Sequence, residues 1–228
     1  MYSDEFLDSY TAQSINALSL VDQNLDLLAE RSETYIRLLS IDTELQSCLR
    51  TYLTQYDSDD FAKRNLNASV TSMLGGTFAP TSHMLGLCIY YDGDILYSQA
   101  GIDEQDVLRI LSPQCLEQIY TRTAPVWQAN LYTVAEHQTR HEPVSRDIVS
   151  LSKKIVNREN GHHLGVITIL IEEAAFSSLY DSNNAACYLV NQNGTIVSST
   201  DKSCLYRPLS DALQLCKFRA VSHTCTEI

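Results

Sequence analysis

Two histidines, His137 and His141, stand four residues apart with Glu136 and Glu142 beside them. On a helix this spacing places both imidazoles on one face, where they and a carboxylate would offer nitrogen and oxygen ligands to a zinc ion. Pro143 follows directly and favours a loop over a helix. The two rings then need not face the same way, and the sequence predicts no metal site here.

Catalytic motifs are missing from the sequence. It holds no Gly-x-Ser-x-Gly elbow, no phosphate-binding Walker loop and no His-Glu-x-x-His pair. The adjacent His162 and His163 stand in a polar stretch that favours a solvated turn over a metal site. We therefore predict no catalytic residues, no cofactor and no enzymatic activity for this chain, with a small hydrolase as the alternative.

The seven cysteines are scattered, and no two have the Cys-x-x-Cys spacing of zinc or thioredoxin-like sites. Cys48, Cys88 and Cys187 lie in apolar segments and are expected in the core. The three that crowd the C-terminus, from Cys204 to Cys225, would allow one disulfide in an oxidising compartment. An odd total leaves at least one thiol unpaired.

Aromatic and basic side chains gather on the strands of one predicted sheet, at Tyr97, Trp127, Tyr132, Arg146 and Lys153. Small-molecule pockets are walled by such aromatic rings and carry a few convergent polar groups. We therefore predict these five residues as ligand-binding. Strand alternation sets Trp127 and Tyr132 on opposite faces, so only one of them is expected at the ligand. The alternative is that Trp127 is a core residue and that Arg146 and Lys153 are solvated charges.

The composition is that of a folded protein and excludes two classes of partner. The chain has 228 residues, 44% hydrophobic and 19% charged, with a formal net charge of -12. An acidic surface disfavours nucleic acid and anionic lipid headgroups, which both need a basic face. No apolar run reaches the roughly 18 residues of a membrane span, and no signal peptide follows Met1. A soluble protein and a segment between two membrane spans both fit this pattern.

The first 56 residues contain neither proline nor glycine, and they predict one long helix from about Ser3 to Tyr56. Apolar residues recur on it with nearly heptad spacing. The members of this seam are Leu18, Val21, Leu25, Leu28, Ser32, Tyr35 and Leu39. A helix of some 50 residues would extend roughly 75 Å, so it would form a spine for several modules, a homodimer seam, or both. The alternative is a helix packed on its own domain with a kink near Ser40.

Two hairpins are expected from apolar strands joined by Asp-Gly and Asn-Gly turns, the strongest short-range hairpin signal. They span residues 85–98 and 186–199. Helices are predicted over 57–73, over 103–120 with a kink at Pro113, over 172–180 and over 210–218. Strands are predicted over 126–134, 148–156 and 164–171, the first two joined by a polar loop. Residues 164–171 are apolar on both faces, which predicts a central strand.

This order of elements resembles the extracytoplasmic double-Cache sensor domains of bacterial membrane-bound sensor histidine kinases. Three segments carry the resemblance: Ile41 to Leu49 at the close of the long helix, Ile148 to Ile155 leading into Leu164 to Glu172, and Tyr188 to Asp201 at the start of a second module. The resemblance implies an α+β fold with PAS-like antiparallel sheet modules behind a long N-terminal helix. Only 27 residues follow Asp201 in the 228-residue chain, so the second module is expected to be truncated or reduced.

The resemblance also implies an organisation and a function. A spine helix would span residues 1–55, a membrane-distal module 56–174 and an incomplete proximal module 175–228. The domain would bind a small polar molecule outside the cell and signal across the membrane, as part of a membrane-embedded kinase. The sensor of a chemoreceptor or of a cyclic-nucleotide-signalling receptor, and an intracellular PAS-like interaction module, are the alternatives. Tyr120, Arg122 and Trp127 match the family's amino-acid-binding signature only loosely, so no amino-acid ligand is implied.

Overall fold

The computed structural model describes residues 2–54, 60–76, 84–99, 102, 104–134, 144–180, 187–191 and 193–215. Within these ranges the side chains of residues 2–14, 17, 18, 60, 75, 76, 131–134, 144, 145 and 213–215 are not described. The chain divides into two compact units, which we call the sheet unit, residues 32–172, and the terminal unit, residues 1–31 with 173–228. None of the described helices has the length and apolar character needed to cross a membrane.

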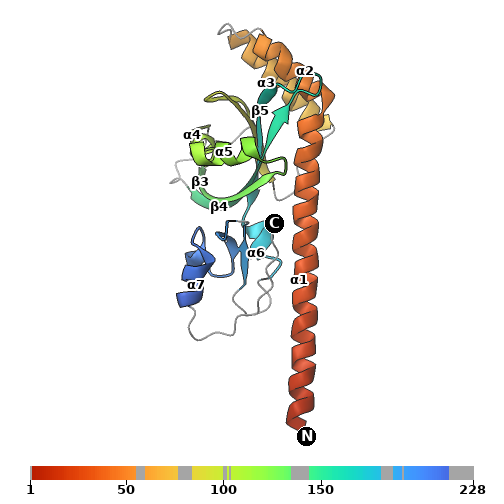
Figure 1. Ribbon diagram of the computed structural model, residues 1–228, viewed down its shortest axis with the longest axis vertical. Helices are drawn as coiled ribbons and strands as arrows, with labels where there is room; N and C mark the ends of the chain where they lie inside the picture. Colours follow the sequence, from red (N-terminus) through yellow and green to blue (C-terminus); the bar gives the residue numbers. More distant parts are fainter. Residues whose placement is uncertain are drawn as a thin grey trace. The chain divides into compact units, whose positions relative to one another are not determined.

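Helices and strands follow one another largely as the sequence predicts (Figure 1). The helices are α1 (Tyr2–Ile41), α2 (Thr43–Thr54), α3 (Asp60–Gly76), α4 (Glu104–Ile110), α5 (Pro113–Thr121), α6 (Ala174–Ser177) and α7 (Leu209–Leu215), with a 3-10 turn at Lys202–Cys204. The strands are β1 (Met84–Tyr91), β2 (Asp94–Ser98), β3 (Val126–Val134), β4 (Val144–Val156), β5 (His163–Glu172), β6 (Tyr188–Val190) and β7 (Ile196–Ser199). The polar loop predicted between the strands 126–134 and 148–156 lies mostly outside the described residues, and β4 begins at Val144, four residues before its predicted start.

The predicted single N-terminal helix is interrupted at Asp42, which separates α1 from α2. The Asp42 carboxylate accepts a hydrogen bond from the Leu45 amide at 2.8 Å, the contact that an N-cap residue makes. Gln46 is buried and donates to the carbonyls of Ser40 and Val156, so the break is tied to strand β4. The prediction of one continuous helix is corrected at this position, because a side-chain cap competes with the helical hydrogen bond.

Five strands form one antiparallel sheet in the order β2-β1-β5-β4-β3. Strand β5 is central and buried on both faces, which confirms the prediction for residues 164–171. Asp92 and Gly93 turn the first hairpin with φ of 48° and 96°, as a primed hairpin turn requires. Gly165 in β5 has a φ of 146°, and a Cβ there would meet the Tyr90 carbonyl at 2.9 Å, so only glycine fits.

The sheet is covered on both sides by helices of its own unit (Figure 1). Helices α4 and α5 pack on one face, where Val107, Leu111 and Ile119 meet Cys88 and Val166 of the sheet. We call this the α4–α5 face. The C-terminal end of α1, with α2 and α3, lies against the opposite face, which we call the α1 face.

The helix predicted over 103–120 with a kink is instead two helices, α4 and α5. Ser112 caps α5 by accepting from the Cys115 amide at 3.3 Å, and Pro113 occupies its first turn. Proline suits that position, since the amide it lacks has no partner in the first turn of a helix. Pro113 therefore begins a new helix, whereas the sequence analysis predicted that it would kink a continuous one.

In the terminal unit, β6 and β7 form the second predicted hairpin. The Asn191 carboxamide oxygen accepts from the amides of Asn193 and Thr195, both at 3.0 Å, and Gly194 has a φ of 75°. These contacts hold the turn that the Asn-Gly pair predicts.

Glu173, at the start of the terminal unit, is buried and accepts several hydrogen bonds. Its carboxylate accepts from the Ser198 hydroxyl at 2.5 Å, the Ser199 amide at 3.2 Å and the Ser177 hydroxyl at 3.3 Å. The Lys202 ammonium forms an ion pair with it. A buried carboxylate needs such partners because an unpaired charge is costly away from water.

Candidate functional site

Trp127, the only tryptophan, lies on the α1 face of the sheet and is buried. Its indole N–H donates to the Glu33 carboxylate of α1 at 3.1 Å. Glu33 also forms an ion pair with Arg37, one turn further along the helix. Trp127 therefore joins strand β3 to α1, a packing role consistent with the alternative that the sequence left open.

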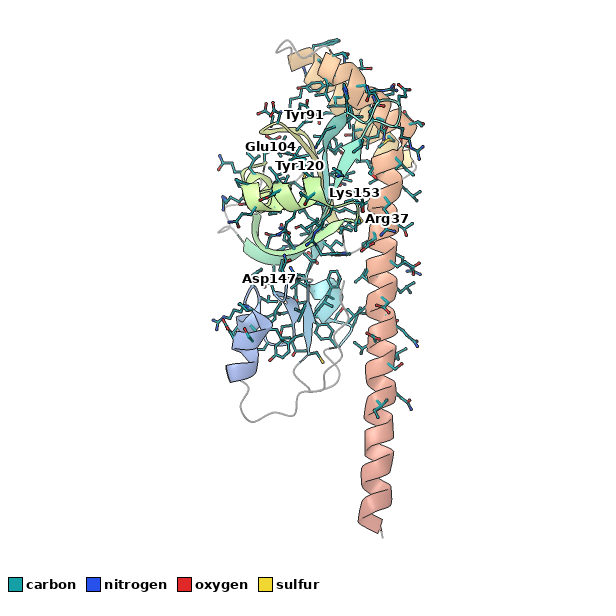
Figure 2. The ribbon with its side chains drawn as sticks, viewed as in Figure 1. Arg37, Tyr91, Glu104, Tyr120, Asp147 and Lys153 are labelled. Atoms are coloured by element: carbon teal, nitrogen blue, oxygen red, sulfur yellow. The ribbon has the colours of Figure 1, made fainter. Side chains whose placement is uncertain are left out.

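Lys153 of β4 lies on the same face as Trp127, because it stands two residues after Leu151, which pairs with Trp127 across the two strands. Its ammonium donates to the Thr123 carbonyl at 2.5 Å. Burial lowers the pKa of Lys153, and the nearby charges of Arg37 and Lys154 lower it further. Figure 2 shows Lys153 and Arg37 close together on the side of the sheet that faces α1. Trp127 and Lys153 therefore lie on the same face of the sheet.

Tyr97 is on the α1 face as well, but on edge strand β2, with three strands between it and Trp127 on β3. It is buried, and its hydroxyl accepts from the Thr71 hydroxyl of α3 at 3.5 Å. Burial, with a smaller effect from Tyr97, raises the pKa of Tyr35 to about 12. Tyr97 therefore belongs to the packing of the N-terminal helices and is separated from Trp127.

Arg146 and Tyr132 are paired across strands β3 and β4. The Arg146 guanidinium forms an ion pair with Glu172 on β5 at 2.5 Å, and both side chains are partly exposed. Strand alternation places Arg146 on the face opposite Lys153. The Tyr132 side chain is outside the described ones. The four predicted residues whose side chains are described thus divide between the two faces of the sheet.

A polar stripe that the sequence analysis missed crosses the α4–α5 face. Ser150, Ser152 and Thr168 are at most 1% exposed, and Asn130 stands beside them. The Asn130 amide donates to the Ser150 hydroxyl, and the hydroxyls of Ser152 and Thr168 share a hydrogen bond, both at 2.9 Å. The sequence does contain a signal for this stripe, because Ser150 and Ser152 alternate with apolar residues along β4 and so point to one face of the sheet.

The opposite positions of the same strands are apolar on the α1 face. Val149, Leu151, Ile167, Ile169 and Ile171 are all buried there. If both faces of the sheet served only as core, both would be expected to be apolar. The contrast between the two faces marks the α4–α5 face as the candidate ligand-binding face.

Three buried side-chain atoms have no hydrogen-bond partner among the described residues, and all belong to α5 or its surroundings. They are Gln118 Oε1, Arg122 Nη1 and His163 Nε2. Gln118 is on α5, and Arg122 follows its last turn. The His163 ring packs edge-on against Tyr120 of α5, with centroids 4.8 Å apart. Buried polar atoms are rarely left unpaired, so these three offer hydrogen bonds to a bound molecule or water.

His163 is held in its neutral form. Burial lowers the pKa of its imidazole, and the neighbouring Lys154 ammonium lowers it further. Nδ1 accepts from the Gly165 amide at 2.8 Å, so the ring proton is on Nε2, the unpartnered atom. Lys154 itself donates to the Tyr120 carbonyl at 2.7 Å.

Two buried thiols on the α4–α5 face are unreactive. Burial raises the pKa of Cys88 to about 12 and that of Cys115 to about 11, so both stay protonated. Cys48 and Cys187 are half-buried. Among the described residues no three His, Cys, Asp or Glu side chains are grouped as metal ligands. His137 and His141 lie outside the described residues.

The fold resembles solved bacterial domains at low sequence identity. The ligand-binding domain of the Campylobacter jejuni chemoreceptor Tlp3, solved with L-valine, is 14% identical with a TM-score of 0.58, covering 93% of this chain and 82% of that one. The ligand-binding domain of the Pseudomonas fluorescens chemoreceptor CtaA, solved with L-serine, is 16% identical with a TM-score of 0.56, covering 96% and 83%. The periplasmic domain of Vibrio cholerae LuxQ is 14% identical with a TM-score of 0.51, covering 83% and 79%.

The chain shares its fold with these three solved domains. The match confirms the predicted α+β class, with an N-terminal helix and a five-stranded antiparallel sheet. Because the identities are low, the likeness concerns the fold alone. No protein-family model matches the sequence, and no curated protein matches it.

Proposed function

We propose that this chain is the ligand-sensing domain of a membrane receptor and that it binds a small polar molecule without turnover. The observation that carries the proposal is the polar stripe on one face of the sheet, in which Ser150, Ser152 and Thr168 are buried and the half-buried Asn130 lies beside them. Polar groups buried beneath two short helices suit a ligand that is itself polar, since each can exchange its present hydrogen bond for one to the ligand.

The unpartnered atoms at α5 support the same face. Arg122 Nη1 and His163 Nε2 are donors, and Gln118 Oε1 is an acceptor. A ligand that carries an anionic or carbonyl oxygen would accept from the first two. Small amino acids are the first ligands to test, because Tlp3 and CtaA were solved with such molecules.

The receptor is proposed to be a sensor histidine kinase with this domain outside the cytoplasm, as the resemblance in the sequence implies. A chemoreceptor is the second candidate, because the solved domains named above include two from chemoreceptors. Both placements need membrane spans beside the domain. The parent gene tests this, because apolar runs of about 20 residues are expected both before Met1 and after Ile228.

Ligand binding is tested by a thermal-shift screen of polar metabolites, with amino acids included. A ligand at 100 times its Kd stabilises the native state by about 2.7 kcal/mol, which corresponds to a rise in Tm of roughly 5–10 °C for a chain of this size. We expect Ser150→Ala and Asn130→Ala to reduce the rise by more than half. Ile169→Val, on the opposite face, is the matched control for loss of stability and should leave the rise intact.

Two results would count against the proposal. One is a hit whose stabilisation is the same in all of these variants, since the ligand would then bind elsewhere. The other is chemical conversion of the ligand by the chain, measured by mass spectrometry of the incubated compound.

A further inference from the structure

Strand β3 is an edge of the five-stranded sheet, and it lacks the features that usually prevent an edge strand from pairing. It has β4 as its only neighbour in the sheet, and the two strands stay in register over all nine residues without a bulge. The strand contains no charged residue, no proline and no glycine. Edge strands of natural proteins are usually short, bulged, charged or covered, because a free edge is a template for another strand.

The opposite edge of the same sheet, strand β2, is protected. It has only five residues and begins with the exposed Asp94, and its pairing with β1 is interrupted between Ile89 and Tyr90. Helix α3 packs against it, where the hydroxyls of Thr71 and Tyr97 are 3.5 Å apart. The open edge is therefore a feature of β3 and does not follow from the fold of the sheet.

The middle of β3 is accessible to another chain. Gln128, Ala129 and Asn130 are all half-buried. Among the described residues, their backbone groups make no backbone hydrogen bond to a turn or loop. In an antiparallel edge strand, every second residue directs its N–H and C=O away from the sheet. A strand added outside β3 would find these groups ready to form a ladder.

We propose that β3 of a second copy of this chain pairs with β3 in antiparallel orientation, about a two-fold axis at Asn130. The two sheets then form one sheet of about ten strands. This register keeps residues of one face on that face, as a continuous sheet requires. The cross-strand pairs are Val126 with Val134, Trp127 with Thr133, Gln128 with Tyr132, Ala129 with Leu131, and Asn130 with itself.

A second copy is the occupant because the sequence of β3 is complementary to itself. No pair in this register sets like charges against each other, although each chain has a formal net charge of -12. Residues that favour strands, β-branched or aromatic, stand at both ends of β3, at Val126, Trp127 and Tyr132 to Val134. A two-fold contact needs only this one patch, and it occupies the edges of both copies, so assembly stops at a dimer.

The pairing is expected to be weak and to depend on salt. Two strands alone form a unit that is only marginally stable in water. The negative charge of each chain opposes the approach of the other, and salt screens this repulsion. We therefore expect a Kd on the order of 100 μM at about 0.15 M salt, with tighter association at about 1 M.

Sedimentation equilibrium of the full chain tests the proposal. Ala129→Lys places a charge near the centre of β3, where each copy would bring its own lysine close to the other, and it should weaken the dimer at least tenfold. Ser98→Lys, at the end of the protected edge strand β2, is the matched control and should leave the Kd unchanged. Circular dichroism of each variant checks that it is folded.

Disulfide trapping tests the register. Asn130 meets itself across the two-fold axis, with Cα atoms about 4.5–5.5 Å apart, which is within reach of a disulfide. Under mild oxidation Asn130→Cys should form a covalent dimer well above the background from the native thiols of the wild type. Ala129→Cys is the matched control: its two copies are diagonal neighbours, roughly 7–8 Å apart, and should cross-link no more than the wild type.

Four results would overturn the proposal. A chain that stays monomeric to about 500 μM would leave an extended segment of another protein as the occupant of the edge. A dimer that keeps its Kd in Ala129→Lys would be held together elsewhere. Equal cross-linking of Ala129→Cys and Asn130→Cys would contradict the two-fold register. Growth beyond a dimer would show that pairing does not close on itself.

Discussion

At the scale of the residue, variants of Trp127 distinguish a packing role from a ligand-binding role. Trp127→Phe keeps an aromatic ring but removes the N–H that donates to Glu33, so it should cost about 1 kcal/mol of stability, against about 3–5 kcal/mol for Trp127→Ala. Urea denaturation measures both. Because Trp127 lies on the α1 face, Trp127→Phe should change the Kd of a ligand by less than about twofold. A tenfold change would place Trp127 at the ligand, as the sequence predicts.

His163 should make the stability of the sheet unit depend on pH. Its pKa is lowered in the folded state by burial and by Lys154, whereas an unfolded histidine titrates near 6.5. The unfolded chain therefore binds the proton first, and the stabilising contribution present above about pH 6.5 is lost as the pH falls through the folded pKa. Protonation would also oppose the hydrogen bond that Nδ1 accepts from Gly165.

The measurement is the free energy of unfolding of the wild type and of His163→Phe between pH 7.5 and 5.5. The phenylalanine variant keeps a ring to pack against Tyr120 and cannot titrate. We expect the wild type to lose more stability than the variant over this range. Parallel pH profiles would show that His163 contributes nothing to the dependence.

At the scale of the element, Asp42 decides where α1 ends and α2 begins. Asp42→Ala removes the cap on the Leu45 amide and should cost about 0.5–2 kcal/mol, whereas Asp42→Asn keeps an acceptor and should cost only a few tenths. Chemical denaturation gives the two values. If both variants match the wild type, the interruption is held by Gln46 and its contacts to Ser40 and Val156 instead of by the cap.

At the scale of the whole molecule, two neighbouring glutamates each form an ion pair within a different compact unit. Glu172 closes the sheet unit and pairs with Arg146, and Glu173 opens the terminal unit and pairs with Lys202. Glu173→Ala would leave the Ser199 amide and the Ser198 hydroxyl without their acceptor, at a cost of about 2–4 kcal/mol. Glu172→Ala loses only a partly exposed ion pair, worth at most about 1 kcal/mol.

Hydrogen exchange resolves these effects by unit. Glu173→Ala should speed exchange of the amides of β6 and β7 while strands β4 and β5 keep their protection, because each unit has its own core. Glu172→Ala is the control and should leave both groups close to wild type. Equal loss of protection in both units would mean that the chain unfolds as one cooperative body.

The sequence by itself determined the features that depend on neighbours along the chain. Asp92 and Gly93 in the first hairpin turn and Gly194 in the second have positive φ, which few residues tolerate, so the Asp-Gly and Asn-Gly pairs mark these turns in the sequence. The run at 164–171, in which Thr168 is the one polar side chain, specifies a strand buried on both faces, since an unpaired polar group there would lose its water. From such elements and their order, the α+β fold with a five-stranded sheet could be predicted.

Only the tertiary structure decided which side chains meet. Tyr97, Trp127 and Lys153 point to the α1 face and Arg146 to the other, because strand register and parity set the face and no local pattern states the partner. Leucines stand on more than one side of α1, and packing alone decided that Leu25 and Leu39 are buried while Leu27 and Leu38 are exposed. The sequence shows the alternating serines of β4. Only the pairing of distant strands shows that Asn130 and Thr168 lie beside them and complete the polar stripe.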